Sequence, residues 1–259
     1  MRVSLSSLSP ALCLALASLN LAGCGGSSPP ADTPRAVTGS SNLSGLWRVV
    51  STVGSSTQRT AVTVVDNGAN LTLNDCSLGY RNYALTRSGN QLAGYYFNLA
   101  PLLITNNDTM TYDYNTINRD FAKMDRDVLY DMGNFTISSA AFPTVNATSD
   151  ICAGFTDSGS AESLILSTRI NGEMLRLTIT LTNSLRVGSF EIEPYGNAPA
   201  TVNLDGAALN TMVGTESVSV LQGTLKITKR GTVFVEGTVT GTLEDTATSI
   251  NIAFKAETP

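Results

Sequence analysis

The chain has 259 residues, with 16 Lys and Arg against 21 Asp and Glu, and a formal net charge of −5. It has no histidine, so the usual general base at neutral pH and the commonest transition-metal ligand are both absent. Its basic residues are scattered and its net charge is acidic, which is not the electrostatic pattern of a nucleic-acid-binding protein. It has neither a phosphate-binding loop nor a dinucleotide fingerprint. We therefore expect no nucleic-acid partner, metal or cofactor.

The first 23 residues have the pattern of a secretory signal. Arg2 is their one charge, and the mostly apolar run PALCLALASLNLA follows at Pro10–Ala22. This run is shorter than the ~20 apolar residues of a membrane-spanning helix. An ordinary signal peptide followed by a coincidental cysteine is the alternative.

The end of this segment, Leu21-Ala22-Gly23-Cys24, resembles the lipobox of bacterial lipoproteins. The resemblance implies cleavage before Cys24 and attachment of diacylglycerol and a fatty acyl group, such as palmitate, to that cysteine. Several acyl chains on one residue suffice for stable membrane anchoring. Residue 25 is Gly and not Asp, which by resemblance to the enteric sorting pattern implies the outer membrane of a Gram-negative bacterium. The side that the protein faces, periplasm or exterior, stays open.

Residues 24–42 should form a lipidated tether. They are rich in Gly, Ser, Pro and Thr and have almost no large apolar side chain, so they cannot form a core. Residues 43–259 are then the folded part. We expect one β domain, with a subdivision near residues 143–150 left open.

Four turn signals predict β-hairpins, and each turn position fixes which residues face each other. In three of them a two-residue turn is expected, and in the fourth a three-residue loop places Gly231 in the left-handed region. The expected tips and facing pairs are Asn67-Gly68 with Val64 opposite Leu71, Ser88-Gly89 with Leu85 opposite Leu92 and Tyr83 over Gly94, Asn171-Gly172 with Leu166 opposite Leu177, and Lys229–Gly231 with Ile227 opposite Val233.

The remaining chain predicts more strands and two helical segments. Strands at this spacing, joined by Gly and Asn turns, favour an antiparallel barrel or sandwich. Apolar residues near helical period at 117–132 predict one amphipathic helix against the sheet or across a barrel opening, and a shorter helical turn is expected at Ala207–Val213. The further strands expected are Leu46–Val53, Met110–Tyr114, Phe135–Ala140, Leu185–Ile192 and Ser249–Lys255.

Two cysteines remain for a disulfide. Cys13 leaves with the signal and Cys24 carries lipid, so Cys76 and Cys152 are left. Two cysteines in an oxidising compartment most simply form one bridge, whose long loop gives about 4 kcal/mol in the chain-entropy model. Two buried thiols are the alternative.

The sequence contains few residues that could act in catalysis. Asp125 with Asp127, or Glu191 with Glu193, could supply paired carboxylates, but a solvated face is the favoured explanation. Asn106–Asp108 could donate oxygens to calcium, although Asn and Asp are ordinary turn residues. We therefore expect no catalytic residues. A carboxylate-dependent hydrolase is the enzyme reading that stays open.

The single tryptophan begins the first strand, in Gly45-x-Trp47. This short motif resembles the start of the lipocalin family and related calycins. The resemblance implies an up-and-down barrel, closed at one end by Trp47, whose lumen holds an apolar ligand. A core tryptophan on a first strand is the alternative.

Tyrosines and Phe97 gather near one predicted hairpin. Tyr80, Tyr83, Tyr95 and Tyr96, together with Trp47, are our candidate ligand contacts, because aromatic bodies with polar tips suit a cavity. Strand packing is the alternative. The expected function is a lipid-anchored binding or carrier domain for an apolar or lipid-like ligand. The alternative is a non-catalytic accessory or structural part of a cell-envelope assembly, favoured by Thr-rich strand faces such as that of Thr178, Thr180 and Thr182.

Overall fold

The structure is a computed structural model that describes residues 42–75, 81–124, 132–193, 198–231, 234–244 and 248–257. All of these belong to one compact unit, Ala36–Pro259. The predicted signal segment, Cys24 and nearly all of the predicted tether lie outside the described residues.

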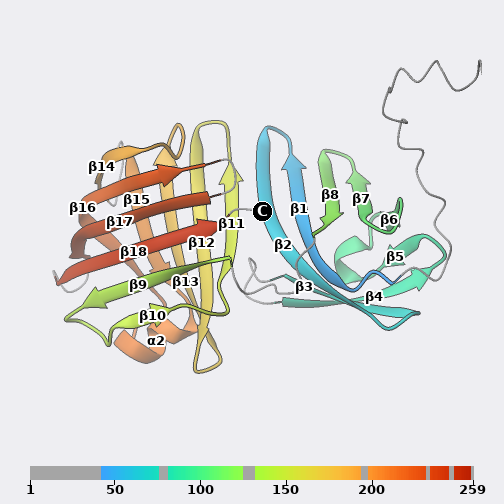
Figure 1. The fold of residues 1–259 in the computed structure, drawn as a ribbon, viewed down its shortest axis with the longest axis horizontal. Coiled ribbons are helices and arrows are strands. Elements are labelled where there is room, and N and C mark those ends of the chain that lie inside the picture. The colour runs from blue at the N-terminus through green and yellow to red at the C-terminus, as the bar shows by residue number, and fades with distance from the viewer. Residues whose placement is uncertain are drawn as a thin grey trace, which may run out of the picture. The chain divides into compact units, whose positions relative to one another are not determined.

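The first eight strands form a closed antiparallel barrel (Figure 1). Each strand pairs with the next along the chain, and β1 pairs with both β2 and β8, which closes the ring. The predicted fold class, mainly β with an antiparallel barrel, is confirmed. The strands are β1 (Gly45–Val53), β2 (Ser56–Asp66), β3 (Asn70–Asp75), β4 (Arg81–Ser88), β5 (Gln91–Ala93), β6 (Leu102–Ile104), β7 (Thr109–Tyr114) and β8 (Ile117–Lys123).

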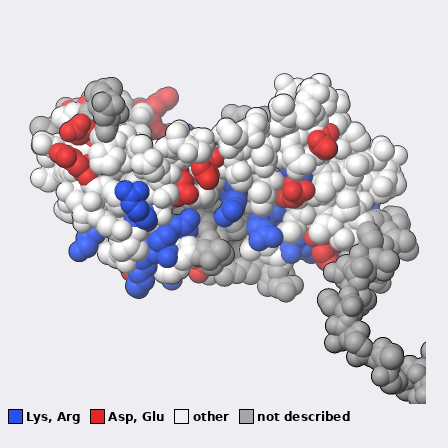
Figure 2. All heavy atoms as spheres, turned by 90° about the horizontal axis from the view of Figure 1, so that it is seen from above, with Lys and Arg blue, Asp and Glu red and all other residues white. Residues whose placement is uncertain are grey.

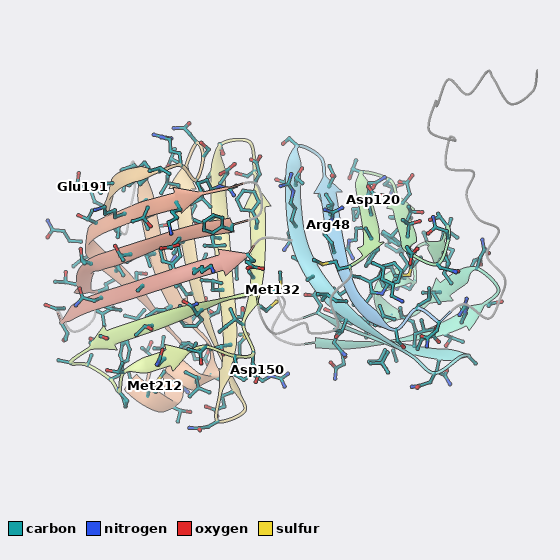
Figure 3. The ribbon with its side chains drawn as sticks, in the orientation of Figure 1. Arg48, Asp120, Met132, Asp150, Glu191 and Met212 are labelled. Carbon is teal, nitrogen blue, oxygen red and sulfur yellow. The ribbon has the colours of Figure 1, made fainter. Side chains whose placement is uncertain are left out.

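Alternation along these strands separates the barrel interior from its outside. Trp47 on β1 and Phe121 on β8 are buried in one core cluster, whereas their neighbours Arg48 and Asp120 are exposed (Figure 3). Successive strand residues point to opposite faces, so every second residue enters the lumen. The interior cluster comprises Leu43, Trp47, Val49, Val62, Val64, Leu71, Leu73, Tyr83, Leu85, Leu92, Phe97, Leu102, Ile104, Met110, Tyr112 and Phe121.

The second half of the chain forms a further curved sheet. β10, β9, β18, β17 and β16 follow one another in pairing order, β14 and β15 share the next edge of β16, and β15 continues through β13 and β12 to β11. The Met132 N–H donates to Ile151 O at 3.2 Å, where β9 approaches β11. The strands are β9 (Gly133–Ser139), β10 (Val145–Ala147), β11 (Cys152–Asp157), β12 (Ala161–Ile170), β13 (Glu173–Thr182), β14 (Gly188–Ile192), β15 (Ala200–Asp205), β16 (Ser217–Arg230), β17 (Phe234–Leu243) and β18 (Ser249–Glu257).

This second sheet encloses its own core and is joined to the barrel through β2. Residues 57–59 of β2 pair with residues 155–157 of β11. Leu46 and Ala61, which point out of the barrel, are buried in the second core cluster. The change from one core to the other falls between β8 and β9. Residues 143–150, where the sequence left a subdivision open, include β10, which pairs with β9.

One predicted helix is present and the other is wrong. The α-helix α2 (Ala207–Val213) matches the expected helical turn, and Gly214 ends it in the left-handed conformation with φ 76°. Residues 117–123 of the predicted amphipathic helix form strand β8 instead, and residues 125–131 lie outside the described part. Ile117 and Phe121 are four apart, a spacing that fits one face of a helix and also one face of a strand.

The Asn171-Gly172 hairpin is confirmed. Leu166 pairs with Leu177, as the turn position predicted. Asn171 and Gly172 both have positive φ, 53° and 86°, which is the backbone that a type I′ turn requires.

Two other hairpins are displaced by two residues from the predicted register. Val64 pairs with Leu73 instead of Leu71, because the turn lies at Gly68-Ala69 and the Asn67 N–H donates to Asn70 O. In the next hairpin, Arg87 pairs with Leu92. A shift of two leaves the same side chains on the inner face, so the apolar pattern cannot detect it.

The predicted loop at Lys229–Gly231 is wrong. Strand β16 continues through Arg230, and the Gly231 N–H donates to Phe234 O. Leu225 therefore pairs with Val239. Gly231 has no positive φ, unlike the residue that the predicted loop required. The pairing of β16 with β17 also has a register irregularity between Ile227 and Lys229.

Candidate binding site in the first barrel

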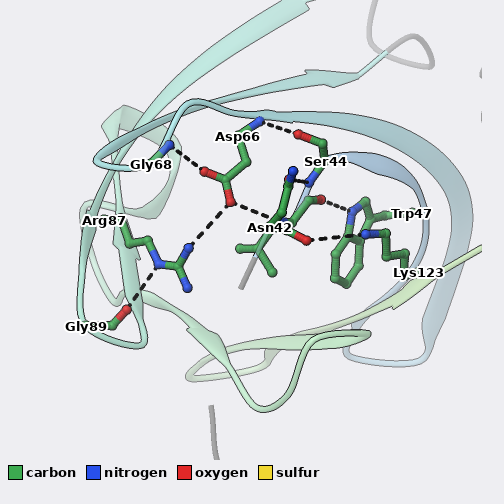
Figure 4. Close-up of polar contacts among 9 residues, drawn as sticks. Asn42, Ser44, Trp47, Asp66, Gly68, Arg87, Gly89 and Lys123 are labelled. Atoms are coloured by element: carbon green, nitrogen blue, oxygen red, sulfur yellow. Dashed lines mark hydrogen bonds and ion pairs between the residues drawn. The ribbon is translucent and has the colours of Figure 1, made fainter. Parts of the chain in front are cut away.

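One end of the first barrel is sealed around Trp47 (Figure 4). The Trp47 ring is fully buried, and its Nε1–H donates to Leu43 O at 2.9 Å. The Lys123 ammonium lies 6.0 Å from the centre of this ring and donates to Asn42 O at 3.4 Å. The start of the described chain is thereby fastened across this end.

A buried ion pair reinforces the same end. Arg87 Nη1 lies 3.4 Å from Asp66 Oδ2, and the two side chains are 7% and 3% exposed. Asp66 also accepts hydrogen bonds from the backbone N–H groups of Leu43 and Gly68, each at 2.8 Å. Buried charges are tolerated when they are paired and hydrogen-bonded, and Asp66 meets both conditions.

The middle of the lumen is packed with aliphatic side chains. Leu85, Leu92, Leu102 and Met110 are at most 2% exposed and lie inside the barrel. A ligand that enters from the sealed end or passes through the whole lumen would have to displace this packing, so the described barrel leaves only the opposite end for a site.

A cavity of about 150 Å³ occupies that opposite end. Its walls come from β1, β2, β3, β4 and β8 and from the short 3-10 helix η1 (Tyr95–Phe97). The apolar and aromatic wall residues are Val49, Val62, Leu73, Tyr83, Phe97 and Phe121, and the polar ones are Ser51, Gln58, Thr60, Asp75 and Arg119. The cavity is therefore amphipathic.

The backbone of Gly94 allows Phe97 to reach this cavity. The Phe97 N–H donates to Gly94 O at 2.9 Å, which closes the turn of η1. A Cβ at residue 94 would lie 2.5 Å from Ala84 O and 2.7 Å from a Leu85 methyl carbon. Glycine thus permits the close approach of this segment to β4. The Phe97 ring then meets Tyr112 edge-on, with centroids 5.1 Å apart.

Arg119 contributes a cation to the cavity wall. It lies on β8, where it pairs with Ser51 of β1 and Tyr112 of β7. Its guanidinium carbon is 5.6 Å from the centre of the Tyr112 ring, within the range of a cation–π contact. Because Arg119 is on the same side of β8 as the buried Phe121, the side chain lies on the inner face.

Of the five aromatic candidates from the sequence, one lines this cavity. Tyr83 is 8% exposed and forms part of the wall. Trp47 lies at the sealed end, and Tyr95 is 83% exposed at the surface. Tyr80 and the side chain of Tyr96 lie outside the described part of the chain.

Arg119 and Phe121 were not among the candidates, whereas Phe97, which the sequence grouped with the tyrosines, lines the cavity. The alternation of residues 117–121 would have placed Arg119 and Phe121 on one face, had this segment been interpreted as a strand. The aromatic cluster identified Phe97 as a residue of interest, but its entry into the cavity depends on the packing of η1 against β4.

The acidic residues considered for catalysis do not form a site in the described chain. Glu191 on β14 and Glu193 just beyond it are exposed, and Asp125 and Asp127 lie outside the described residues. Asn106 Oδ1 accepts a hydrogen bond from the Asp108 N–H at 2.8 Å, so this pair forms a turn. Within the described ranges no three His, Cys, Asp or Glu residues are grouped as a metal would require.

The cysteine predictions stay open. Cys152 is 1% exposed on β11, whereas Cys76 and Cys24 lie outside the described residues. The predicted bridge and the predicted lipid attachment therefore stay predictions.

The face of the molecule in Figure 2 is sparsely charged. It carries both Lys and Arg and Asp and Glu side chains, with large uncharged areas between them. No helix in the described ranges has the length and apolar character needed to cross a membrane.

No protein-family model, curated protein or solved structure matches this chain.

Proposed function

We propose that this protein is a non-catalytic, lipid-anchored binding or carrier protein of the bacterial outer membrane that holds a small apolar molecule. The cavity of the first barrel carries this proposal, because it combines the aromatic walls of Tyr83, Phe97 and Phe121 with a few polar groups. Ligand sites are typically concave and mostly apolar, with a small number of polar groups that fix orientation.

The size of the cavity limits the ligand. A volume of about 150 Å³ is below the roughly 300–1,000 Å³ of sites for drug-sized molecules. An apolar cavity of roughly 150 Å³ binds benzene in another protein. The proposed ligand is therefore a single ring or a short chain, or a lipid-like molecule that inserts only its end.

The residue pattern supports anchoring and argues against catalysis. Cys24 ends a lipobox-like sequence and would carry the lipid, and the Gly45-x-Trp47 start supports a likeness to lipocalins. Among the described residues the cavity wall has one carboxylate, Asp75, and not the pair that acid–base catalysis without histidine would need.

Native mass spectrometry tests ligand binding. The chain is secreted to a periplasm as the full mature protein with Cys24→Ser, which removes the predicted site of lipid attachment and changes no described residue. We expect a bound small mass that is lost on denaturation and is absent in Ser51→Phe, which fills the cavity. Thr52→Phe, on the outer face of the same strand, should retain the bound mass. A bare mass that persists when small aromatic molecules are added would refute the proposal.

Fractionation tests the anchor separately. We expect the wild-type chain in the outer-membrane fraction and Cys24→Ser in the soluble periplasmic fraction, because a multiply acylated cysteine anchors a protein stably. Recovery of both chains in the same fraction would contradict lipid attachment at Cys24.

A groove beside β10 favours the alternative function, a part of an envelope assembly. β10 pairs with β9 on one edge, and no strand within the described ranges pairs with its other edge. A groove of about 380 Å³ follows this edge, with Thr168–Asn171 and Met212 of α2 on its far side, near Asp150 (Figure 3). An open strand edge is a template for an added strand of a partner protein.

Site-specific crosslinking in cells tests this alternative. A photoreactive residue at Asn146, which is exposed on β10, should capture one defined envelope protein, and Met212→Arg should abolish that product by blocking the groove. A photoreactive residue at Thr52, on the barrel, is the control. Products that are the same from both positions would exclude a specific edge interaction.

A further inference from the structure

We infer that the ligand of the first barrel carries a negatively charged group, most simply a carboxylate, that is bound by Arg119. This inference rests on the proposed function and names the class of ligand: small aromatic or short aliphatic acids. Three features of the cavity support it, namely the position of Arg119, the polar groups beside it and the apolar wall opposite the charge.

Arg119 is held in place without a carboxylate partner. Its contact is with the Tyr112 ring, and it takes part in no ion pair with the described residues, whose pairs include Asp66–Arg87, Arg176–Asp205 and Lys229–Glu236. A guanidinium offers five N–H donors in a planar fork that matches a carboxylate. The cation–π contact with Tyr112 does not use the N–H groups of this fork as hydrogen-bond donors, so they are available to an anion.

The neighbouring polar groups are uncharged. Ser51 lies beside Arg119 on β1, and Gln58 faces Ser51 from β2. Both side chains line the cavity and can donate hydrogen bonds to an anion. Hydrogen bonds in which the donor or the acceptor is charged are roughly twice as strong as neutral ones, and an arginine can make two parallel bonds to one carboxylate. Arg119 would therefore dominate the orientation of the ligand.

The other charged residue of the cavity wall, Asp75, lies on a different part of the barrel. Asp75 is on β3, which is separated from β8 by β1 and β2. Asp75 has an interaction partner of its own. A carboxylate bound at Arg119 can therefore keep its distance from Asp75, while the ring lies between Phe97 and Phe121.

Three probes of similar size separate the contributions of shape and charge. Benzoate, benzyl alcohol and benzylamine share one ring and carry a negative charge, no charge and a positive charge near pH 7. Calorimetric titration of the full mature Cys24→Ser chain with each should give the order benzoate, benzyl alcohol, benzylamine. We expect benzoate to bind about tenfold more tightly than benzyl alcohol, as one charge-assisted hydrogen bond would produce.

Variants of Arg119 test whether this residue causes the preference for benzoate. Arg119→Gln should remove the preference for benzoate and leave the binding of benzyl alcohol within about twofold, while Arg119→Lys should retain part of it because the charge remains. Arg48→Gln, on the outer face of β1, is the matched control and should bind all three probes as the parent does.

The outcomes distinguish this inference from the proposed function. If the three probes bind equally, if benzylamine binds best, or if Arg119→Gln keeps the benzoate preference, the inference is wrong and the binding function stands. If none of the probes binds and no mass accompanies the purified chain, the binding function itself is wrong.

Discussion

Asp66 joins three separate parts of the chain at the sealed end of the barrel. Its carboxylate accepts from the N–H groups of Leu43 and Gly68 and pairs with Arg87, and its own N–H donates to Ser44 Oγ. The side chains of Asp66 and Arg87 are 3% and 7% exposed. The consequence of losing one partner is therefore larger than the net stabilisation by the pair, because the other charge stays buried.

We expect Asp66→Ala to lower the free energy of unfolding by roughly 3 kcal/mol or more, because it leaves the Arg87 charge buried without its partner. Urea unfolding followed by tryptophan fluorescence measures this, since Trp47 lies at the same end. Glu236→Ala, which removes the exposed Lys229–Glu236 pair, should change stability by less than about 1 kcal/mol. Equal effects of the two substitutions would show that burial of the Asp66 pair has no special importance.

A second residue-scale prediction concerns Gly94. Gly94→Ala places a Cβ against Ala84 O and must move η1 away from β4. We expect the substitution to displace Phe97 and to weaken benzoate binding more than tenfold, while most of the secondary structure is retained. Ala93→Ser, on the exposed neighbouring position, is the control. Unchanged binding in Gly94→Ala would mean that Phe97 is not part of the site.

At the scale of elements, the geometry of each turn decided whether the sequence pattern could predict the pairing register of its hairpin. The Asn171-Gly172 turn has a specific backbone requirement, and its register was predicted correctly. The hairpins after β2 and β4 were displaced by two residues, because period-two patterning is unchanged by an even shift. Segment 117–123 was mistaken for a helix, because its apolar spacing of four is common to both periods.

The hairpin between β12 and β13 should be sensitive to its turn residues. Gly172→Ala introduces a side chain at φ 86°, which should destabilise the protein by about 1–2 kcal/mol. Asn171→Gly should be close to neutral, because glycine accepts the same backbone. Thermal unfolding by circular dichroism compares the two variants. A stable Gly172→Ala would contradict the type I′ assignment.

At the scale of the whole molecule, two cores are connected within one compact unit. The β2–β11 pairing and the burial of Leu46 and Ala61 join the barrel to the second sheet. β1 and β2 are thus covered on their outer faces at Leu46 and Ala61, while Arg48 and Val65 stay exposed. In both strands, apolar residues occupy odd and even positions. This pattern is typical of a strand with core on both faces, but it does not identify which core each side chain enters.

The predicted Cys76–Cys152 bridge would add a covalent link between the two halves, because Cys152 lies at the start of β11. We expect Cys76→Ser with Cys152→Ser to lower the free energy of unfolding by about 4 kcal/mol, the cost of restoring freedom to a long loop. Urea titrations with and without reductant measure this. The mass of the alkylated, non-reduced chain is the control. Two alkylated cysteines at positions 76 and 152 would show that no bridge forms.

The sequence by itself determined the β class, the general positions of most strands, the helical turn at Ala207–Val213 and one hairpin register. These follow from local alternation and turn chemistry, which act over a few residues. Only the tertiary structure decided that β8 closes on β1, and that Phe97, Arg119 and Tyr83 meet at one end of the barrel. Those relations depend on ring closure and on strands far apart in the chain, and no local period records which distant strand completes a barrel.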